Sequence, residues 1–476
     1  MSAPAGRTAH VVVVGGGISG LATAYRLART PANGISVDVT VLEESPRLGG
    51  KLASVEVGGL QLEAGADSFV TRKPQAVELC TELGLSDELV VPGTAGTFVL
   101  REGRLIPFLR SQALGVPTES EELLRWPGMS LRGRVRATFD TLKPPAAPER
   151  DISIGELVRK RLGSEALRVL VGPLLGGLFA GDPDRLSVDA TFPELKAWAA
   201  GRGMIRGARA ALKARDKVED TPAMRAMFAT VWGGLDRLVE VLAHAIGEER
   251  ILRDTPVRSI RATTPALELE VPGEPVRADA VALATPAFAA AELLAGDAST
   301  ALREIPYAST AVVLLVYPEG SASKLPDGTG FVVPRGKADV TACTWVSRKW
   351  PRPEFGGRAI LRCYLGRAGA EEVLAEPDGT LIDRVVGDLD RVLNLGRPED
   401  ARVVRWERSM PQYEVGHLER VRRIREALPG GIFVTGSAYG GVGIADCVRQ
   451  AGETARDVHS YLQSLRTERE TVPWTS

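Results

Sequence analysis

Cysteine and histidine are scarce in this sequence, and their scarcity excludes several kinds of site. There are four cysteines among 476 residues, with neither a C-x-x-C pair nor a metal-ligand spacing. We therefore predict reduced, packed thiols, no metal and a cytoplasmic location. The four histidines lie in no recognisable catalytic setting, which disfavours a nicotinamide dehydrogenase with a histidine acid or base. The cysteines are Cys80, Cys343, Cys363 and Cys447.

An excess of charge of one sign and long apolar runs are also missing. Lys plus Arg number 59 and Asp plus Glu number 60, so no overall charge attracts nucleic acid or an anionic membrane. The segment 1–9 lacks the apolar core of a signal peptide. The most apolar stretch, 167–180, is interrupted by Arg168, Pro173 and glycines, so we expect no membrane span. Peripheral membrane contact stays open.

The amino-terminal region contains the pattern of a dinucleotide-binding unit. An apolar run over 11–14 is typical of a buried parallel strand, and the spacing Gly15-x-Gly17-x-x-Gly20 opens a helix directly after it. Gly15 would make the turn, Gly17 would let the backbone approach a pyrophosphate, and Gly20 would let the helix pack on the strand. The next strand ends at Glu43, whose carboxylate would accept hydrogen bonds from a ribose diol.

A second glycine-rich turn near the carboxyl-terminal end indicates a flavin rather than a nicotinamide. An apolar strand over 431–436 leads to the turn 440–444, where another helix begins. The N–H groups at this helix start would face the flavin edge that becomes anionic on reduction. Arg47 and Lys51 could neutralise the diphosphate. Together these features predict FAD as the cofactor.

The rest of the chain alternates between strand-rich and helical patterns. Short strands over 251–283 are typical of a β-meander that returns to a dinucleotide-binding sheet, so we expect this domain to be discontinuous. Strands rich in Val, Thr and Trp over 310–365 predict a second sheet. A capping box at Ser153 and Glu156 begins a helical region.

Read together, these stretches resemble the amine-oxidase and protoporphyrinogen-oxidase superfamily of flavoproteins, and within it the Gram-positive coproporphyrinogen III oxidase type. The matching motifs extend over nearly the whole chain. They are Glu63-Ala-Gly-Ala-Asp-Ser-Phe69, Pro173-Leu-Leu-Gly-Gly-Leu-Phe-Ala-Gly-Asp182, Thr341-Ala-Cys-Thr-Trp345 with Lys349-Trp-Pro351, Ser409-Met-Pro-Gln-Tyr413, and Val442-Gly-Ile-Ala-Asp-Cys447.

The resemblance implies an α/β fold: a discontinuous Rossmann-like FAD-binding domain with a mixed-sheet substrate domain and an α-helical domain. In membrane-bound relatives the helical domain serves for attachment. The expected bounds are 1–71, 229–287 and 405–476 for the FAD-binding domain, 72–99, 196–228 and 288–404 for the substrate-binding domain, and 100–195 for the helical domain.

The resemblance also implies which residues form the site. Lys73 matches a lysine that is important for activity, and it is our first candidate for binding a substrate propionate. Phe179 stands where relatives often have a tyrosine, and we place it in the substrate pocket. The expected FAD contacts are Gly15, Gly16, Gly17, Ile18, Ser19, Gly20, Glu43, Glu44, Lys51, Gly65, Ala66, Asp67, Ser68, Val257, Trp406, Val442, Gly443 and Ile444.

The activity that the resemblance implies is FAD-dependent oxidation of coproporphyrinogen III to coproporphyrin III in haem biosynthesis. O2 would be the acceptor and H2O2 the second product, and a downstream ferrochelatase could be a transient partner. A protoporphyrinogen IX oxidase, a flavin amine oxidase and a non-catalytic flavin-binding module remain alternatives. Amine oxidases stack aromatic side chains in front of the flavin, and here only Tyr439 lies near the second turn.

Overall fold

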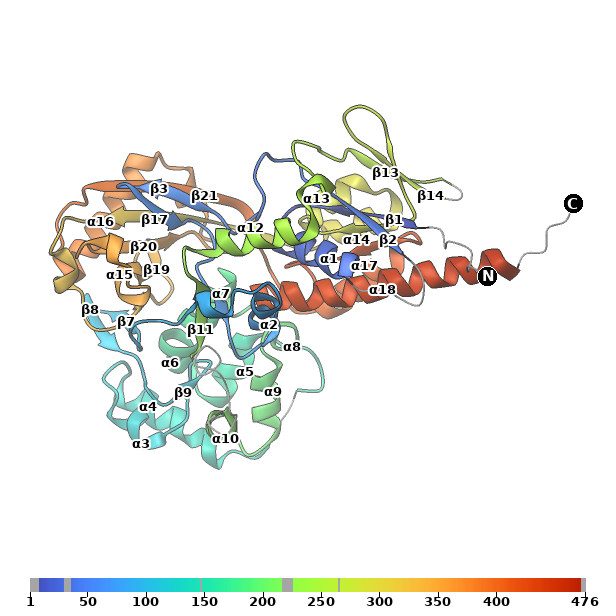
Figure 1. Ribbon diagram of the computed structural model, residues 1–476. Helices are drawn as coiled ribbons and strands as arrows, with labels where there is room; N and C mark the ends of the chain where they lie inside the picture. Colours follow the sequence, from blue (N-terminus) through green and yellow to red (C-terminus); the bar gives the residue numbers. More distant parts are fainter. Residues whose placement is uncertain (1–7, 30–35, 146–147, 216–225, 264–265, 472–476) are drawn as a thin grey trace, which may run out of the picture.

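Three regions meet near the start of one long helix, α18 (Ile444–Thr471). The computed structural model describes residues 8–29, 36–145, 148–215, 226–263 and 266–471. A parallel sheet with its helices lies at the right of Figure 1, a mixed sheet at the left and a group of helices below. The expected α/β fold with these three parts is confirmed.

The parallel sheet takes its strands from three distant parts of the chain. Its order is β12-β2-β1-β16-β22, and all neighbouring pairs are parallel. The side chains of the central strand are buried on both faces because its sequence is a run of valines. The discontinuous arrangement predicted from the sequence is therefore confirmed. The strands are β1 (Ala9–Val14), β2 (Val37–Leu42), β12 (Ile251–Leu252), β16 (Ala280–Leu283) and β22 (Ile432–Val434).

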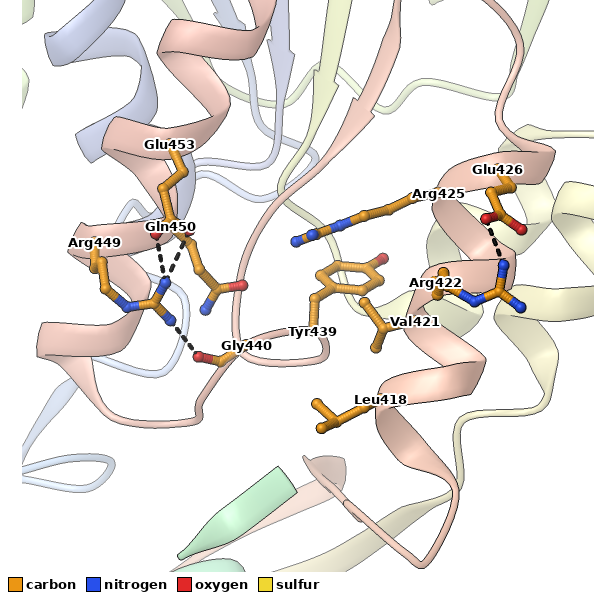
Figure 2. Close-up of a pocket in the computed structure, with 10 residues that line it drawn as sticks. All are labelled: Leu418, Val421, Arg422, Arg425, Glu426, Tyr439, Gly440, Arg449, Gln450 and Glu453. Atoms are coloured by element: carbon orange, nitrogen blue, oxygen red, sulfur yellow. Dashed lines mark hydrogen bonds and ion pairs between the residues drawn. The ribbon is translucent and has the colours of Figure 1, made fainter. Parts of the chain in front are cut away.

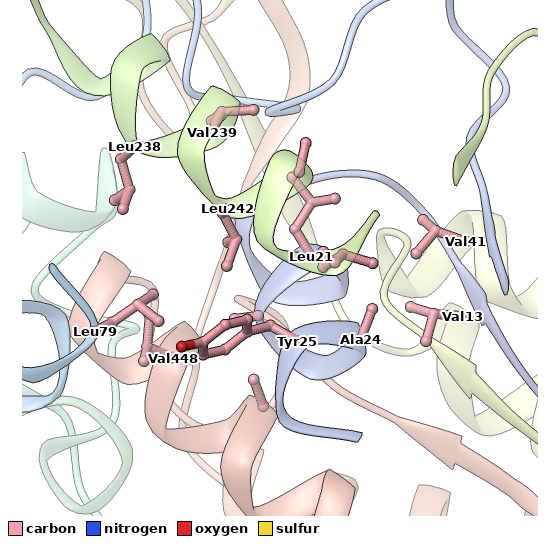
Figure 3. Packing of buried hydrophobic residues seen from close by; sticks show 14 of the residues in the cluster. Val13, Leu21, Ala24, Tyr25, Val41, Leu79, Leu238, Val239, Leu242 and Val448 are labelled. Atoms are coloured by element: carbon pink, nitrogen blue, oxygen red, sulfur yellow. The ribbon is translucent and has the colours of Figure 1, made fainter. Parts of the chain in front are cut away.

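Helices cover both faces of this sheet. Figure 3 shows Leu21 and Tyr25 of α1 packed between Leu242 of α12 and Val448 of α18. The other face carries a small antiparallel sheet, which is the predicted meander, and helices α13, α14 and α17. The bounds of these elements are α1 (Ile18–Arg29), α12 (Leu235–Ile246), β13 (Ser259–Thr263), β14 (Ala266–Glu270), β15 (Val276–Ala278), α13 (Ala287–Leu293), α14 (Gly296–Arg303) and α17 (His417–Ala427).

The second sheet has the order β21-β17-β20-β19-β18-β7-β8 and is mixed, because β18 and β7 are parallel while the other pairs are antiparallel. Alternate side chains of β17 enter two different cores, one under α16 and one under the hairpin β3–β4. The elements are β3 (Ser54–Val57), β4 (Leu60–Glu63), β7 (Phe98–Arg101), β8 (Arg104–Pro107), β17 (Tyr307–Val316), β18 (Gly330–Val332), β19 (Val340–Trp345), β20 (Ile360–Leu365), α16 (Asp378–Leu393) and β21 (Asp400–Pro411).

The helical region has its own core and contains a buried ion pair. Arg161 Nε donates to Asp140 at 2.6 Å, and the N–H of Ile205 donates to the same carboxylate at 3.0 Å. The segment η3 is a π-helix with Pro173 inside it. The helices are α3 (Ser120–Arg125), α4 (Leu131–Thr138), η2 (Phe139–Leu142), α5 (Ile154–Arg161), α6 (Ser164–Ala166), η3 (Leu167–Gly176), α7 (Gly177–Phe179), α8 (Val188–Thr191), α9 (Pro193–Ala200) and α10 (Met204–Arg215).

Smaller elements connect the three regions. A three-stranded sheet has the order β5-β11-β6, and the short hairpin β9–β10 lies at the helical region. No helix within the described residues has both the length and the apolar character needed to cross a bilayer. The remaining elements include β5 (Phe69–Val70), α2 (Gln75–Glu82), β6 (Leu89–Val90), β9 (Gln112–Ala113), β10 (Val116–Pro117), β11 (Phe228–Val231) and α15 (Val346–Lys349).

The exact domain bounds stay predictions, and some of them divide single elements. The expected bound after residue 99 falls within β7, and the bound before residue 405 falls within β21. The core of the helical region continues through Ala208, beyond the expected end at residue 195, because α9 and α10 pack against the same helices. All four cysteines are buried and unpaired, as predicted.

Candidate functional site

The first glycine turn connects β1 to α1 at the carboxyl edge of the parallel sheet. Gly15 has a φ of +106°, which a glycine adopts without strain. A Cβ on Gly20 would lie 1.9 Å from the carbonyl oxygen of Gly15, so only glycine fits there. A Cβ on Gly17 would meet its nearest neighbour, Gly50, at 3.9 Å. The fold itself therefore leaves space at Gly17, as expected where a ligand approaches the backbone.

Glu43 lies at the end of β2, directly beside this turn. Its Oε2 accepts a hydrogen bond from the N–H of Gly16 at 2.6 Å, and its Oε1 accepts two from Ser45. Each carboxylate oxygen offers about two acceptor positions, so Oε2 retains one for a ribose hydroxyl. The loop that precedes Val257 is bonded to the same residue, because Thr255 N–H donates to the Glu43 carbonyl. Glu44 is exposed.

The loop after Glu43 crosses over the first turn. The N–H of Gly49 donates to the carbonyl of Gly16 at 2.9 Å. Arg47 donates to the carbonyls of Leu48, Leu52 and Gly50, so three of its five N–H donors stabilise the loop. This position gives no support to the expectation that Arg47 neutralises a diphosphate.

The two glycine turns, far apart in sequence, meet at this edge. Ser19, in the first turn of α1, lies close enough to Cys447 of α18 to lower the pKa of its thiol. A Cβ on Gly436 would lie 3.3 Å from Ser19 Oγ. Burial raises the pKa of Cys447 and lowers the pKa of nearby Lys51, whose positive charge partly offsets the effect on the thiol. The expected cofactor residues Ser19 and Lys51 are thus brought to the first turns of α18, the helix that begins at Ile444.

A third segment, residues 64–68, packs against Lys51, and we call it the Gly65 segment. A Cβ on Gly65 would lie 1.8 Å from the carbonyl oxygen of Lys51, so glycine permits this close approach. Trp406 of β21 donates its indole N–H to the carbonyl of Ala64 at 2.9 Å. The ring lies next to Gly65, with an atom 3.4 Å from the position of a Cβ. Two expected cofactor contacts, Gly65 and Trp406, therefore touch each other.

Lys73 precedes α2 in the sequence, and its side chain reaches the start of α18. Its ammonium group donates to both carboxylate oxygens of Asp446, at 2.6 and 2.8 Å. Asp446 is buried and belongs to the first turn of the helix, whereas the lysine side chain is 42% exposed. Two of the three ammonium donors are used, and one is left for a substrate. Asp446 is 373 positions from Lys73, so no local pattern in the sequence predicts this pairing.

A buried group of charges, which we call the Asp67 cluster, lies between the Gly65 segment and the mixed sheet. It consists of Glu63, Asp67, Lys349, Arg352 and Arg362. Lys349 Nζ lies 3.1 Å from Asp67, and Arg362 lies 3.7 Å from the same carboxylate. The cluster contains one more positive than negative charge.

Opposing effects act on the two carboxylates of the Asp67 cluster. Burial alone would raise the pKa of Asp67, but Arg362, Lys349 and hydrogen bonds outweigh burial and hold it well below its usual range. For Glu63, burial dominates and raises the pKa despite the charge of Arg352. The sequence did contain a signal for this cluster, since Arg362 interrupts an otherwise apolar strand.

Side chains between the end of β21 and the start of α17 support the second glycine turn. Tyr413 donates its hydroxyl to the carbonyl of Ser437 and accepts from the N–H of Gly441, both at 2.7 Å. His417 stacks on Tyr413 with ring centroids 3.8 Å apart. The ring of Phe179 is buried against Phe192 and Tyr413, so its expected contact with a substrate stays a prediction.

The polar atoms left at the carboxyl edge fit a dinucleotide. Thr285 and Thr435 follow the ends of β16 and β22, and their buried hydroxyl oxygens have no hydrogen-bond partner among the residues that the structure describes. Thr285 also lies within 3.4 Å of the position of a Cβ on Gly15. Unpartnered buried hydroxyls are costly unless a ligand or water satisfies them. Within the described residues no group of His, Cys, Asp and Glu could hold a metal ion.

Comparison with known proteins places this geometry in a family. Residues 18–459 match the family described as flavin containing amine oxidoreductase. The chain belongs to this family. It is therefore a flavin-containing oxidoreductase, and FAD, the cofactor expected from the sequence, is the one that family membership supports.

Individual members of the flavin-containing amine oxidoreductase family are similar over almost their whole length. The chain is 36% identical to coproporphyrinogen III oxidase of Bacillus subtilis over 96% of this chain and 99% of that protein. It is 32% identical to coproporphyrinogen III oxidase of Staphylococcus aureus, over 96% and 100%. A crystal structure described as a candidate protoporphyrinogen oxidase from Exiguobacterium sp. superimposes with a TM-score of 0.83 at 31% identity, over 96% and 99%.

We expect Gly17→Ala to lose bound flavin, while its flavin-free form is as stable as flavin-free wild type, because within the described residues its Cβ meets no atom closer than 3.9 Å but fills the space left for the pyrophosphate. Gly20→Ala should lower the free energy of unfolding by at least about 1–3 kcal/mol, since its Cβ overlaps the Gly15 carbonyl. Gly452→Ala in α18, where a Cβ meets nothing within 4 Å, is the matched control. Thermal unfolding and the ratio of flavin to protein absorbance measure both effects. A fully yellow Gly17→Ala protein would contradict the assignment.

We also expect His417 to make stability depend on pH. Burial, reinforced by Arg420, lowers its pKa to about 4, whereas an unfolded histidine titrates near 6.5. The unfolded state thus binds the proton first, and the stabilisation present above pH 6.5 decreases as the pH falls toward 4, by on the order of 3 kcal/mol. His417→Phe keeps the stacked ring and should flatten this dependence in urea unfolding. His244→Asn, at an exposed position, is the control; equal slopes for His417→Phe and wild type would refute the prediction.

Proposed function

We propose that the protein oxidises coproporphyrinogen III to coproporphyrin III with O2. The observation that carries the proposal is the meeting of both glycine turns with Lys73 at the start of α18, in a chain whose similarity to named coproporphyrinogen III oxidases covers nearly its full length. FAD, when bound, supplies the two-electron chemistry and its reoxidation by O2. Loss of six hydrogens from one porphyrinogen corresponds to three O2 consumed and three H2O2 formed.

The chain's own residues bind and orient the macrocycle. The substrate carries four propionates, and the protein offers local positive charge although its net charge is only −1. Lys73 has one ammonium donor available, and the Asp67 cluster adds one excess positive charge beside the Gly65 segment. Charge-assisted hydrogen bonds of this kind fix the orientation of a carboxylate-rich ligand.

The structure gives less support to an amine oxidase. Tyr439, the aromatic residue nearest the second turn in sequence, is 2% exposed and packs in the core next to α17. Its ring faces the side chains of that helix in Figure 2. It therefore does not supply the aromatic wall that such enzymes place in front of the flavin.

A protoporphyrinogen IX oxidase is the second candidate, because the crystal structure from Exiguobacterium sp. bears that description. The two substrates differ in their number of propionates, four against two. The number of positively charged groups that meet the substrate therefore decides between them.

The direct test follows porphyrin fluorescence and H2O2 release from flavin-loaded protein with each porphyrinogen. We expect faster turnover of coproporphyrinogen III and about three H2O2 per porphyrin formed. Faster turnover of protoporphyrinogen IX would establish the second candidate instead. Peroxide release from amines, with neither porphyrinogen oxidised, would refute the proposal.

We expect Lys73→Met to raise the KM for coproporphyrinogen III about tenfold or more, the value of one charge-assisted hydrogen bond, and to leave flavin content unchanged. Lys73→Arg should restore much of the affinity. Asp446→Asn removes the competing carboxylate, so it should not raise KM. If Lys73 acts only by holding Asp446, both Lys73→Met and Asp446→Asn will instead reduce flavin content to the same extent.

Cytoplasmic location, transient contact with a ferrochelatase and peripheral membrane contact stay predictions. One feature supports peripheral membrane contact. Leu131, Phe139 and Leu142 form an exposed apolar stripe on α4 and η2, beside the exposed Arg132. Such a stripe with neighbouring positive charge suits the surface of an anionic bilayer. Co-sedimentation with anionic vesicles would detect the contact, and its absence would remove the proposal.

A further inference from the structure

A groove of about 490 Å³ lies between α17 and the start of α18, beside the second glycine turn. We call it the α17–α18 groove. Leu418 and Val421 of α17 form an apolar side, and Gly440 belongs to the turn itself. Figure 2 shows the side chains of Arg425 and Gln450 extending into the space from opposite sides. No expected cofactor or substrate contact lines this groove.

One of the three arginines around the α17–α18 groove has no carboxylate partner. Arg422 is paired with Glu426 at 2.6 Å and also with Glu419, and Arg449 is paired with Glu453 at 2.7 Å. Arg425 has no hydrogen bond or ion pair to any residue that the structure describes. The guanidinium of Arg425 is thus left to bind a ligand, and its natural partner is one carboxylate group.

Two buried polar atoms at the α17–α18 groove also have no partner. Within the described part of the chain, the hydroxyl of Tyr439 and the Oε1 of Gln450 have no hydrogen bond, although the two side chains are only 2% and 3% exposed. The amide nitrogen of Gln450 is used, because it donates to the carbonyl of Asp446 at 3.2 Å. The groove therefore offers a hydroxyl donor and an amide acceptor, and leaving either unsatisfied is costly.

We propose that the α17–α18 groove binds a small organic monocarboxylate that has an apolar body and a hydroxyl donor. The carboxylate takes the guanidinium of Arg425 and the hydroxyl of Tyr439. The hydroxyl of the ligand donates to Gln450 Oε1, and its apolar body packs on Leu418 and Val421. The cavity lies within the ordinary size range of small-molecule sites.

Gln450, one of the proposed ligand contacts, and the neighbouring Arg449 also hold the second glycine turn, so an occupant would act on the turn. Arg449 donates to the carbonyl of Gly440 at 2.5 Å, and Gln450 reaches the carbonyl of Gly441 at 3.4 Å. Val442 to Ile444, the expected flavin contacts, follow directly. A ligand in the groove would therefore act as an effector of the flavin environment. This effector role rests on the proposed function.

The test uses the full-length, flavin-loaded protein with 4-hydroxybenzoate as probe and neutral 4-hydroxybenzamide as its matched analogue. Binding is measured by ligand-observed NMR and calorimetry, and the flavin absorbance spectrum is recorded during the titration. Arg425→Gln removes the unpaired charge. Arg456→Gln removes an exposed arginine of α18 that lies outside the groove and serves as control.

We expect the acid to bind wild type and Arg456→Gln equally, and Arg425→Gln at least about tenfold more weakly. The amide should bind more weakly than the acid. In wild type, the flavin absorbance spectrum should shift over the same range of acid concentration in which the acid binds. Equal binding to Arg425→Gln, or equal binding of amide and acid, would overturn the site. Binding without a spectral shift would overturn the effector role alone. Because the probe's own NMR signals report binding, protein that fails to oxidise porphyrinogens still tests the groove.

Discussion

The structure depends on the close contact between the amino-terminal ends of α1 and α18, two helices that are far apart in the sequence. α1 begins shortly after Gly15 and α18 shortly after Gly441, and Ser19 of α1 lies beside Cys447 of α18. Both turns need glycine for steric reasons: a Cβ at Gly20 or Gly441 would overlap the Gly15 carbonyl or the Asp446 side chain. Two helix amino termini at one sheet edge concentrate partial positive charge, which is the condition for holding a diphosphate and an anionic ring.

The surrounding charges are arranged around this contact. Asp446, in the first turn of α18, has a favourable position relative to the helix dipole and also neutralises Lys73. Asp67 is kept ionised by Arg362 and Lys349 from the mixed sheet. Removing both Lys349 and Arg362 would leave the buried Asp67 carboxylate without a cation, which costs several kcal/mol. These ion pairs therefore link the Gly65 segment to the mixed sheet and Lys73 to α18. They also set the electrostatic potential at the site.

Local patterns predicted the backbone of the site but not its charge partners. The valine run, the glycine spacing and Glu43 lie within one contiguous unit, so sequence alone was sufficient to place them at one sheet edge. Asp67 and Lys349 are 282 positions apart, and Lys73 and Asp446 are 373 apart. No periodicity links residues at such separations, because their contact is created by how the sheets pack. The same reason explains why α9 and α10 joined the helical core unexpectedly.

The order of strands in the parallel sheet has a consequence for biosynthesis. β1 and β2 leave the ribosome early, but β16 and β22, which complete the other side of β1, are made far later in the chain. At about 5–20 residues per second, the interval before β22 is made is on the order of tens of seconds. During translation the valine-rich edge of β1 is therefore unpaired and prone to aggregation. Cofactor loading must follow chain completion, and a chaperone that shields this edge would raise the yield of active enzyme.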